Sequence, residues 1–157
     1  AEKQRMLSEN RRGVYIMAEA EYVLARKILK LANRIVSGRN ADIRDLGLTS
    51  SQADSLVYFV HNEGRSAVDL KDHLGVTHQT ARGIVKRMAE KNLIEIRISE
   101  EDGRYRRIFV TEKGRSLYRQ MEKNGAHTGN RLLTGMSPEE KQQFSSLISL
   151  ALENMER

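Results

Sequence analysis

The sequence contains no cysteine and no tryptophan, and proline occurs once among its 157 residues. The absence of cysteine excludes a disulfide framework, a thiolate nucleophile and a thiol-based redox sensor. With five Tyr and three Phe, the chain also has few rings on which single-stranded bases could stack. No apolar run approaches the roughly 18 residues of a membrane span, and the N-terminal residues lack a signal-peptide core. We therefore expect a cytoplasmic protein.

Catalytic and metal-binding patterns are also missing. The four histidines lie in different segments, and their spacing matches no common metal-binding motif. There is no glycine-rich phosphate loop, and no serine stands in a nucleophile elbow. We predict no enzymatic activity, no catalytic residue, no cofactor and no metal. A His/Glu metal site assembled by the fold is the alternative that the sequence leaves open.

Charge is unevenly placed in a composition that is otherwise typical of a globular protein. Apolar residues make up 39% of the chain and charged residues 31%, which favours one folded domain over residues 1–157. The net charge is +6, and the stretch 76–115 holds ten Lys and Arg against six Asp and Glu. This excess favours a polyanionic partner, although a basic stretch by itself can be only a solvated face.

Residues 66–90 are typical of two short helices joined by a tight turn. Ser66 is a candidate N-cap with Asp69 as its capping-box partner, and Gly75 can end the first helix in the left-handed conformation. Thr77 is the candidate N-cap of the second helix. The apolar residues that follow it at helical spacing are Ala81, Ile84, Val85 and Met88. Two helices joined in this way form a helix-turn-helix, whose second helix fits the major groove of DNA.

Two runs typical of β-strands follow, at residues 93–98 and 105–110. Between them, Gly103 is free to take a positive φ in the turn. A hairpin directly after a recognition helix is a wing. Its tip carries Arg104, which suits a narrow minor groove, and we expect the Asp102 carboxylate to orient that guanidinium. The pattern predicts a winged helix that binds duplex DNA.

The exposed face of the second helix and the wing supply the candidate DNA contacts. Arg, Lys and Gln side chains on this helix can bond base edges in the major groove, and hydroxyls and further cations can bond phosphates. The candidates are Thr77, His78, Gln79, Thr80, Arg82, Lys86, Arg87, Asp102, Arg104 and Arg106. Two of them have a simpler interpretation: Thr77 as a helix cap only, and Arg87 as a solvated charge only.

Longer helices are predicted on both sides of this region. Apolar residues recur at helical spacing from Gly13 to Ser37, and we expect residues 37–40 to stop that helix and residues 41–48 to form a connector. A capping box at Thr49–Gln52 then opens the first helix of the winged helix. After the wing, Thr111 starts a helix that Gly125 and Gly129 weaken, and the sequence Ser-Pro-Glu-Glu at 137–140 starts the last one.

These terminal helices carry more apolar surface than one winged helix can cover. Val14, Tyr15 and Ile16, for example, extend the apolar surface of the first helix beyond a single stripe. We therefore expect residues 14–37 and 112–157 to be dimerisation helices that pack against a second copy of the chain. The alternative is a helix packed only within its own subunit.

The order of these segments resembles the multiple antibiotic resistance regulator (MarR) family over essentially the whole chain. The most specific part is Asp102-x-Arg104 followed by the stretch VTEKG at 110–114, which is similar to the family's D-x-R…L-T-x-x-G. The resemblance implies a mainly α (α+β) fold, with a winged helix-turn-helix over residues 49–111 and long N- and C-terminal helices that form a dimerisation platform. It further implies a homodimer that binds a pseudo-palindromic operator, usually as a repressor released by a small phenolic or otherwise anionic ligand.

The chain departs from the family pattern at several positions. Asn92 stands where the family favours Gly, a change that Asn tolerates in a left-handed cap. Gly83 replaces a longer, often basic side chain, so one DNA contact is missing. Gly83 is the one feature that favours the alternative function, a winged helix used for protein–protein contact with weak or lost DNA binding. Residues that could line an effector pocket, but are equally well core or interface residues, are Tyr15, Tyr22, Phe59 and His61.

Overall fold

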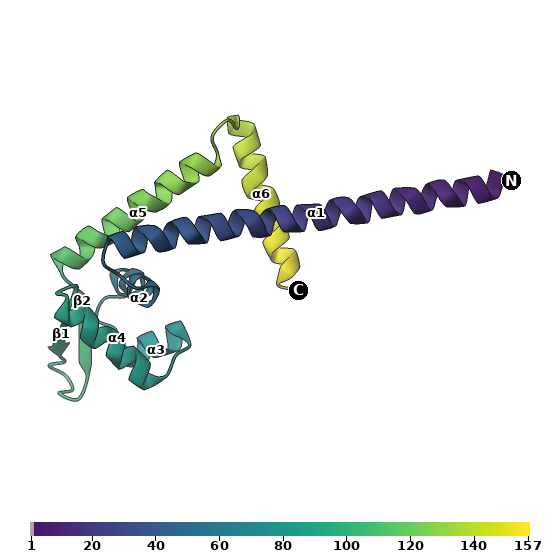
Figure 1. Cartoon of the computed structure of the whole chain (residues 1–157). Coiled ribbons are helices and arrows are strands. Elements are labelled where there is room, and N and C mark those ends of the chain that lie inside the picture. Colours follow the sequence, from purple (N-terminus) through teal and green to yellow (C-terminus); the bar gives the residue numbers. More distant parts are fainter. Residues whose placement is uncertain (1) are drawn as a thin grey trace. The chain divides into compact units, whose positions relative to one another are not determined.

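The computed structural model describes the backbone of residues 2–157 and the side chains of residue 17 and residues 19–157. This part of the chain consists of helices and one two-stranded antiparallel sheet (Figure 1). The elements are α1 (Glu2–Asp45), α2 (Ser50–His61), α3 (Ala67–Leu74), α4 (His78–Glu90), β1 (Ile94–Ile98), β2 (Arg106–Val110), α5 (Glu112–Leu132) and α6 (Pro138–Met155). The mainly α winged-helix fold is thereby confirmed. None of the described helices is long and apolar enough to cross a membrane.

The contacts within the chain divide it into two compact units, residues 1–42 and residues 43–157, where the sequence predicts one domain. The first unit is the greater part of a single helix, α1. Its described side chains up to residue 39 are exposed except for the half-buried Leu31, so residues 17 and 19–39 form no buried core.

The predicted end of the first helix is wrong. α1 continues through residues 37–40 to Asp45, so the expected connector at 41–48 is largely helical. One glycine inside a helix costs only about 1 kcal/mol, and Gly38 has nothing within 4 Å of the place of a Cβ. Burial of Ile43, which is 3% exposed, stabilises the additional turn.

The turn after Asp45 terminates α1 at Gly47, which lies beyond the helix and adopts a positive φ of 73°. The Gly47 amide donates to the Arg44 carbonyl at 2.9 Å, and the Leu48 amide donates to the Ile43 carbonyl at 3.0 Å. This pair of bonds is a Schellman motif, which ends a helix where a residue without Cβ turns left-handed. Ile43 and Leu48 both join the core that α2 begins.

The core of residues 43–157 lies among α2, α3, α4 and the base of the hairpin. The predicted caps are confirmed: Thr49 forms a capping box with Gln52, and Ser66 forms one with Asp69. Each box pairs two free amides of a helix start with side chains. Gly75 ends α3 with a φ of 65°, as predicted. The largest fully buried apolar side chains are Phe59, Leu56, Leu70, Met88, Leu93 and Ile108.

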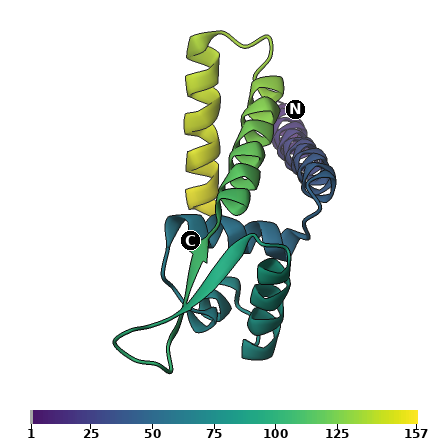
Figure 2. The ribbon, with the colours of Figure 1, turned by 90° about the vertical axis from the view of Figure 1, so that its left-hand side faces the viewer.

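β1 and β2 form a hairpin with Ile94 opposite Val110 and Ile98 opposite Arg106. Asn92, just before β1, has a φ of 58°, which confirms the left-handed cap. Gly103 does not use the positive φ that is open to it, because the turn closes without it: the Tyr105 amide donates to the Asp102 carbonyl at 2.9 Å. Figure 2 shows the hairpin tip projecting away from the helices, and α5 and α6 extend from the opposite end of this unit.

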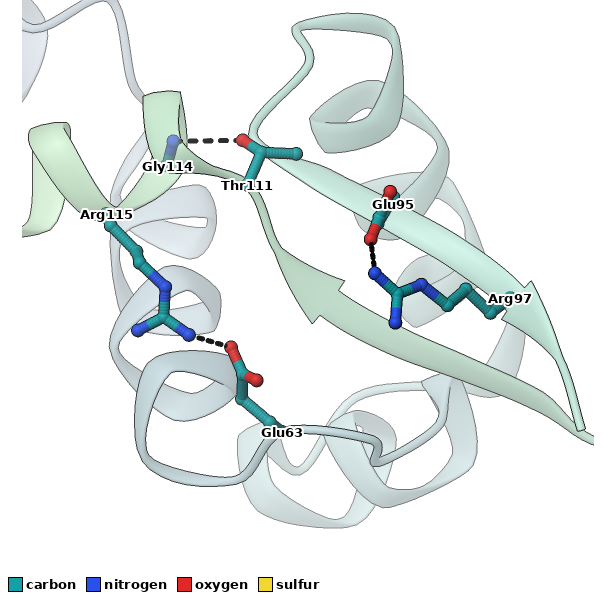
Figure 3. A network of polar contacts seen from close by, with 6 residues as sticks. All are labelled: Glu63, Glu95, Arg97, Thr111, Gly114 and Arg115. Carbon is teal, nitrogen blue, oxygen red and sulfur yellow. Dashed lines mark hydrogen bonds and ion pairs between the residues drawn. The ribbon is translucent and has the colours of Figure 1, made fainter.

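α5 starts from Thr111, whose hydroxyl accepts the Gly114 amide at 3.1 Å (Figure 3). A Cβ on Gly114 would lie 2.2 Å from the Leu93 carbonyl oxygen, so only glycine lets α5 pack against the start of the hairpin. The helix continues through Gly125 and Gly129, and nothing lies within 4 Å of a Cβ at either position. α6 begins with the predicted Ser137 cap and capping box.

Exposed apolar side chains gather on α1 and α6. On α6, Leu147 is 64% exposed and Leu152 is 61% exposed. The predicted apolar residues Val14, Tyr15 and Ile16 lie outside the described side chains. The exposed large apolar residues of α1 are Met17, Tyr22, Val23, Leu24, Ile28, Leu29, Ile35 and Val36.

Candidate nucleic-acid interface

Helix α4 presents one buried face and one exposed face. Thr77 caps it, with its Oγ1 accepting the Thr80 amide at 3.2 Å, so the cap interpretation of Thr77 is correct, whatever else its hydroxyl contacts. The predicted inward residues are all buried: Ala81, Ile84, Val85 and Met88. Because a helix repeats every 3.6 residues, the polar residues between them point to solvent. The exposed predicted residues are Thr77, His78, Gln79, Thr80, Arg82, Lys86 and Arg87.

The cationic side chains on this face of α4 form few ion pairs within the protein. Lys86 lies 3.9 Å from Glu90 one turn later, and an exposed pair at that distance contributes little. In the part of the chain that the structure describes, no ion pair involves Arg82 or Arg87. These guanidinium groups are therefore open to an external anion.

At the tip of the hairpin, Arg104 is exposed and follows the Asp102–Gly103 turn. The Asp102 carboxylate accepts the backbone amide of Arg104 at 3.0 Å. The expectation that this carboxylate also orients the guanidinium stays a prediction. A carboxylate two residues before an amide closes an Asx turn, so Asp102 holds the backbone from which the Arg104 side chain extends.

The arginines on the two faces of the hairpin have different contacts. Because side chains alternate along a strand, Arg106 faces α4, whereas Arg97 and Arg107 lie on the other face. Arg97 pairs with Glu95 (Figure 3) and lies over the Phe109 ring, 4.4 Å from its centroid. Arg107 has a carboxylate partner at 3.5 Å. Alternation thus leaves Arg106 on the same side as the exposed face of α4.

A groove of about 540 Å³ lies between α4 and the hairpin. Its charged lining residues are Arg82, Lys86 and Glu90 of α4 and Arg106 of β2. Three of the predicted residues, from two elements, thus line one groove. Apolar side chains also line it, including Ile96, which is 39% exposed. Ile96 is absent from the predicted site. Strand alternation signals its inward direction, but only the fold reveals the groove.

A second residue missed by sequence reasoning is Lys91, at the end of α4. Its Nζ donates to the Gly47 carbonyl at 2.7 Å and to Gln52 Oε1 at 2.8 Å. The Lys113 ammonium in turn donates to the Lys91 carbonyl at 2.9 Å. These bonds tie the end of α4 to the turn after α1 and to the start of α2 and α5. No local pattern signals them, because the partners of Lys91 lie far away in the sequence.

The residues considered for an effector pocket differ in their burial. Phe59 is fully buried in the core, whereas His61 is exposed, with its Nε2 3.0 Å from the Tyr118 hydroxyl. The pKa of the Tyr118 hydroxyl is raised, mainly by its hydrogen bond with Glu122 and to a smaller extent by desolvation. Tyr22 is exposed on α1, and Tyr15 lies outside the described side chains. Among the described residues, no group of three His, Asp or Glu side chains could hold a metal ion.

Comparison with known proteins gives a consistent set of similarities. The model of the MarR family matches residues 46–104. The uncharacterized HTH-type transcriptional regulator YybA of Bacillus subtilis (strain 168) is 29% identical over 134 residues, covering 85% of this chain and 89% of YybA.

Solved structures of S. aureus MepR share the fold. One point mutant of MepR superposes with a TM-score of 0.78 at 18% identity, covering 83% of this chain and 97% of that one. Another MepR mutant, bound to an oligodeoxyribonucleotide, gives 0.66 at 20% identity, covering 86% and 96%. MepR bound to ethidium bromide gives 0.67 at 18% identity, covering 83% and 95%.

Proposed function

We propose that this chain, whose residues 46–104 match the model of the MarR family and which is similar to an HTH-type transcriptional regulator, is a homodimeric MarR-family repressor that binds a pseudo-palindromic operator. In each subunit α4 enters the major groove and the hairpin enters the adjacent minor groove. The observation that carries the proposal is the placement of Arg82, Lys86 and Arg106 around one groove between α4 and the hairpin. Such a repressor would act in the cytoplasm, on chromosomal DNA.

Each exposed group has a proposed role in that complex. His78, Gln79, Arg82 and Lys86 approach base edges or phosphates, since these side chains extend from the face of α4 that the core leaves free. Arg104 enters the minor groove from the hairpin tip, where a narrow groove concentrates negative potential. Thr77, Thr80 and Arg106 are proposed phosphate contacts, Arg87 is a further proposed DNA contact, and Asp102 acts by holding the Arg104 backbone.

The proposed dimer uses residues 14–37 and 112–157. Exposed apolar side chains on α1 and α6 support this assignment, since patches of this kind on a folded chain mark interaction surfaces. Two-fold symmetry would then place the recognition helices about 34 Å apart, one turn of DNA. A small phenolic or otherwise anionic effector that changes this separation would release the DNA. The ethidium-bound MepR structure supports a small-molecule effector only by analogy with that protein.

The test is fluorescence anisotropy with a duplex from upstream of the protein's own gene and with a random duplex of equal length. We expect tighter binding to the upstream duplex, and an affinity that falls steeply between low and moderate salt because neutralised phosphates release counterions. Equal, salt-insensitive binding to both duplexes would contradict the proposal. It would instead favour the protein–protein module that Gly83 suggests.

Arginine substitutions sharpen this test. Arg104→Ala is expected to weaken operator binding by roughly 5-fold to 100-fold, with an unchanged dimer mass by light scattering. Arg97→Ala is the matched control, because it removes the same charge from the same hairpin, on the strand face that points away from α4. We expect less than about a 2-fold effect from it. Equal effects of the two substitutions would remove the minor-groove role of Arg104.

A further inference from the structure

The middle of the exposed α4 face lacks a side chain, because it is occupied by Gly83. Gln79 lies one turn before this glycine and Lys86 about one turn after it, so all three share one face. A Cβ on Gly83 would lie 3.4 Å from Arg87 Nη1 and 3.7 Å from Arg87 Nη2. The Arg87 guanidinium therefore lies across the place that a side chain at position 83 would fill.

Helix geometry explains this placement. Side chains on an α-helix lean toward its N-terminus, so a long residue covers the surface one turn before its own Cα. For Arg87 that surface is Gly83. Because glycine has no side chain, the Arg87 guanidinium reaches the middle of the exposed face, although Arg87 itself lies at the edge of that face. Among the described residues no carboxylate pairs with it.

We infer that Arg87 is a specificity-determining residue that contacts a base rather than a phosphate. Its guanidinium reaches that base across the space left by the missing side chain of Gly83, which we call the notch. The inference rests on the proposed function, DNA binding by α4. A residue at the middle of the exposed face of a recognition helix points toward the floor of the groove, and a glycine there lets the helix backbone approach closely. A guanidinium at that point can bond guanine O6 and N7 together. Arg87 thus supplies the contact that position 83 itself lacks.

The experiment selects bound sequences from a pool of randomised duplexes, using the wild-type chain and four variants. In the wild type we expect a two-fold symmetric motif with a preferred guanine in each half-site. Arg87→Ala is expected to lower the preference for that guanine by roughly 5-fold to 100-fold while the other positions keep theirs. Arg87→Lys keeps the charge but loses the planar fork, so it should lose the same preference at an unchanged salt dependence.

Gly83→Met tests the notch separately. Its side chain would take the space of the guanidinium, so we expect the preference at the same base pair to disappear although Arg87 is still present. Gly38→Met is the matched control, because it places the same side chain at an α1 glycine outside residues 14–37 and 112–157, with nothing within 4 Å of its Cβ. The selected motif should not change in Gly38→Met.

The outcomes separate the inference from the proposed function. An unchanged motif with uniformly weaker binding in Arg87→Ala would make Arg87 a phosphate contact and overturn the inference alone. A Gly83→Met variant that keeps the wild-type motif would overturn the role of the notch. A wild-type chain that selects no motif would overturn the proposed function and the inference with it. Thermal unfolding of each variant confirms that it is folded, and Arg87→Lys, which preserves charge and most of the length, remains informative if Arg87→Ala is not.

Discussion

Gly114→Ala is expected to destabilise residues 43–157 strongly, although it adds a single methyl group. The new Cβ would lie 2.2 Å from the Leu93 carbonyl oxygen and 2.7 Å from Val110 Cγ1. The nearer atom belongs to the backbone and cannot rotate away. The same carbonyl accepts the Thr111 amide at 3.1 Å, so relieving the clash means moving the start of α5 away from the hairpin.

The expected cost follows from what that movement breaks. Hydrogen bonds from the Thr111 amide to Leu93 and from the Gly114 amide to Thr111 contribute about 1 kcal/mol each. Overpacking adds about 1–3 kcal/mol, and the higher helix propensity of Ala offsets about 1 kcal/mol. The free energy of unfolding should therefore fall by about 2–4 kcal/mol, or roughly 5–15 °C in Tm.

Urea unfolding followed by circular dichroism measures this change. Gly125→Ala is the matched control, since it lies in the same helix and a Cβ there meets nothing within 4 Å. It should be neutral or stabilising by up to about 1 kcal/mol. If Gly114→Ala lies within about 0.5 kcal/mol of the wild type, the packing of α5 against the base of the hairpin is not as described.

Three further perturbations test other parts of the structure. Ser66→Ala removes the capping box of α3 and should lower the free energy of unfolding by about 1 kcal/mol; an unchanged urea midpoint would show that the box is energetically idle. Lys91→Met breaks bonds to Gly47 and Gln52 and should cost about 1–3 kcal/mol in the same assay, whereas equal stability would show that this link is dispensable. A bond to its own backbone and then one to Ser137 lower the pKa of Glu139, so its carboxylate stabilises the fold above its ordinary pKa and loses that effect as the pH falls through the lowered value. The difference in the free energy of unfolding between the wild type and Glu139→Gln should shrink as the pH falls through the lowered pKa. A difference that is independent of pH would contradict the assignment.

Local features could be read from the sequence because a few neighbouring residues determine them. The capping boxes of Thr49, Ser66 and Ser137 each need a hydroxyl and a partner three residues later. The inward face of α4 and the left-handed Asn92 are equally local. The end of α1 was mispredicted because Gly38 is a plausible stop by itself. The choice of Gly47 depends on burial of Ile43 and Leu48 in a core formed by other elements.

The parts of the site that sequence reasoning missed involve contacts between distant residues. Lys91 reaches Gly47 and Gln52 across a long stretch of chain, and Ile96 lines a groove that exists only once β1 lies beside α4. The position of the Arg87 side chain next to Gly83 has a different explanation. Both residues and their one-turn spacing are visible in the sequence. The direction of the Arg87 side chain, however, points to a DNA contact only once this face of α4 is known to be exposed.

Hydroxyl-radical footprinting of the wild-type chain on its selected duplex tests DNA reading by two copies of α4 and the hairpin most directly. We predict two protected segments centred about 10 base pairs apart, each with protection over a neighbouring minor groove that disappears in Arg104→Ala. A single protected segment, or minor-groove protection that survives Arg104→Ala, would contradict DNA binding by a symmetric pair of winged helices.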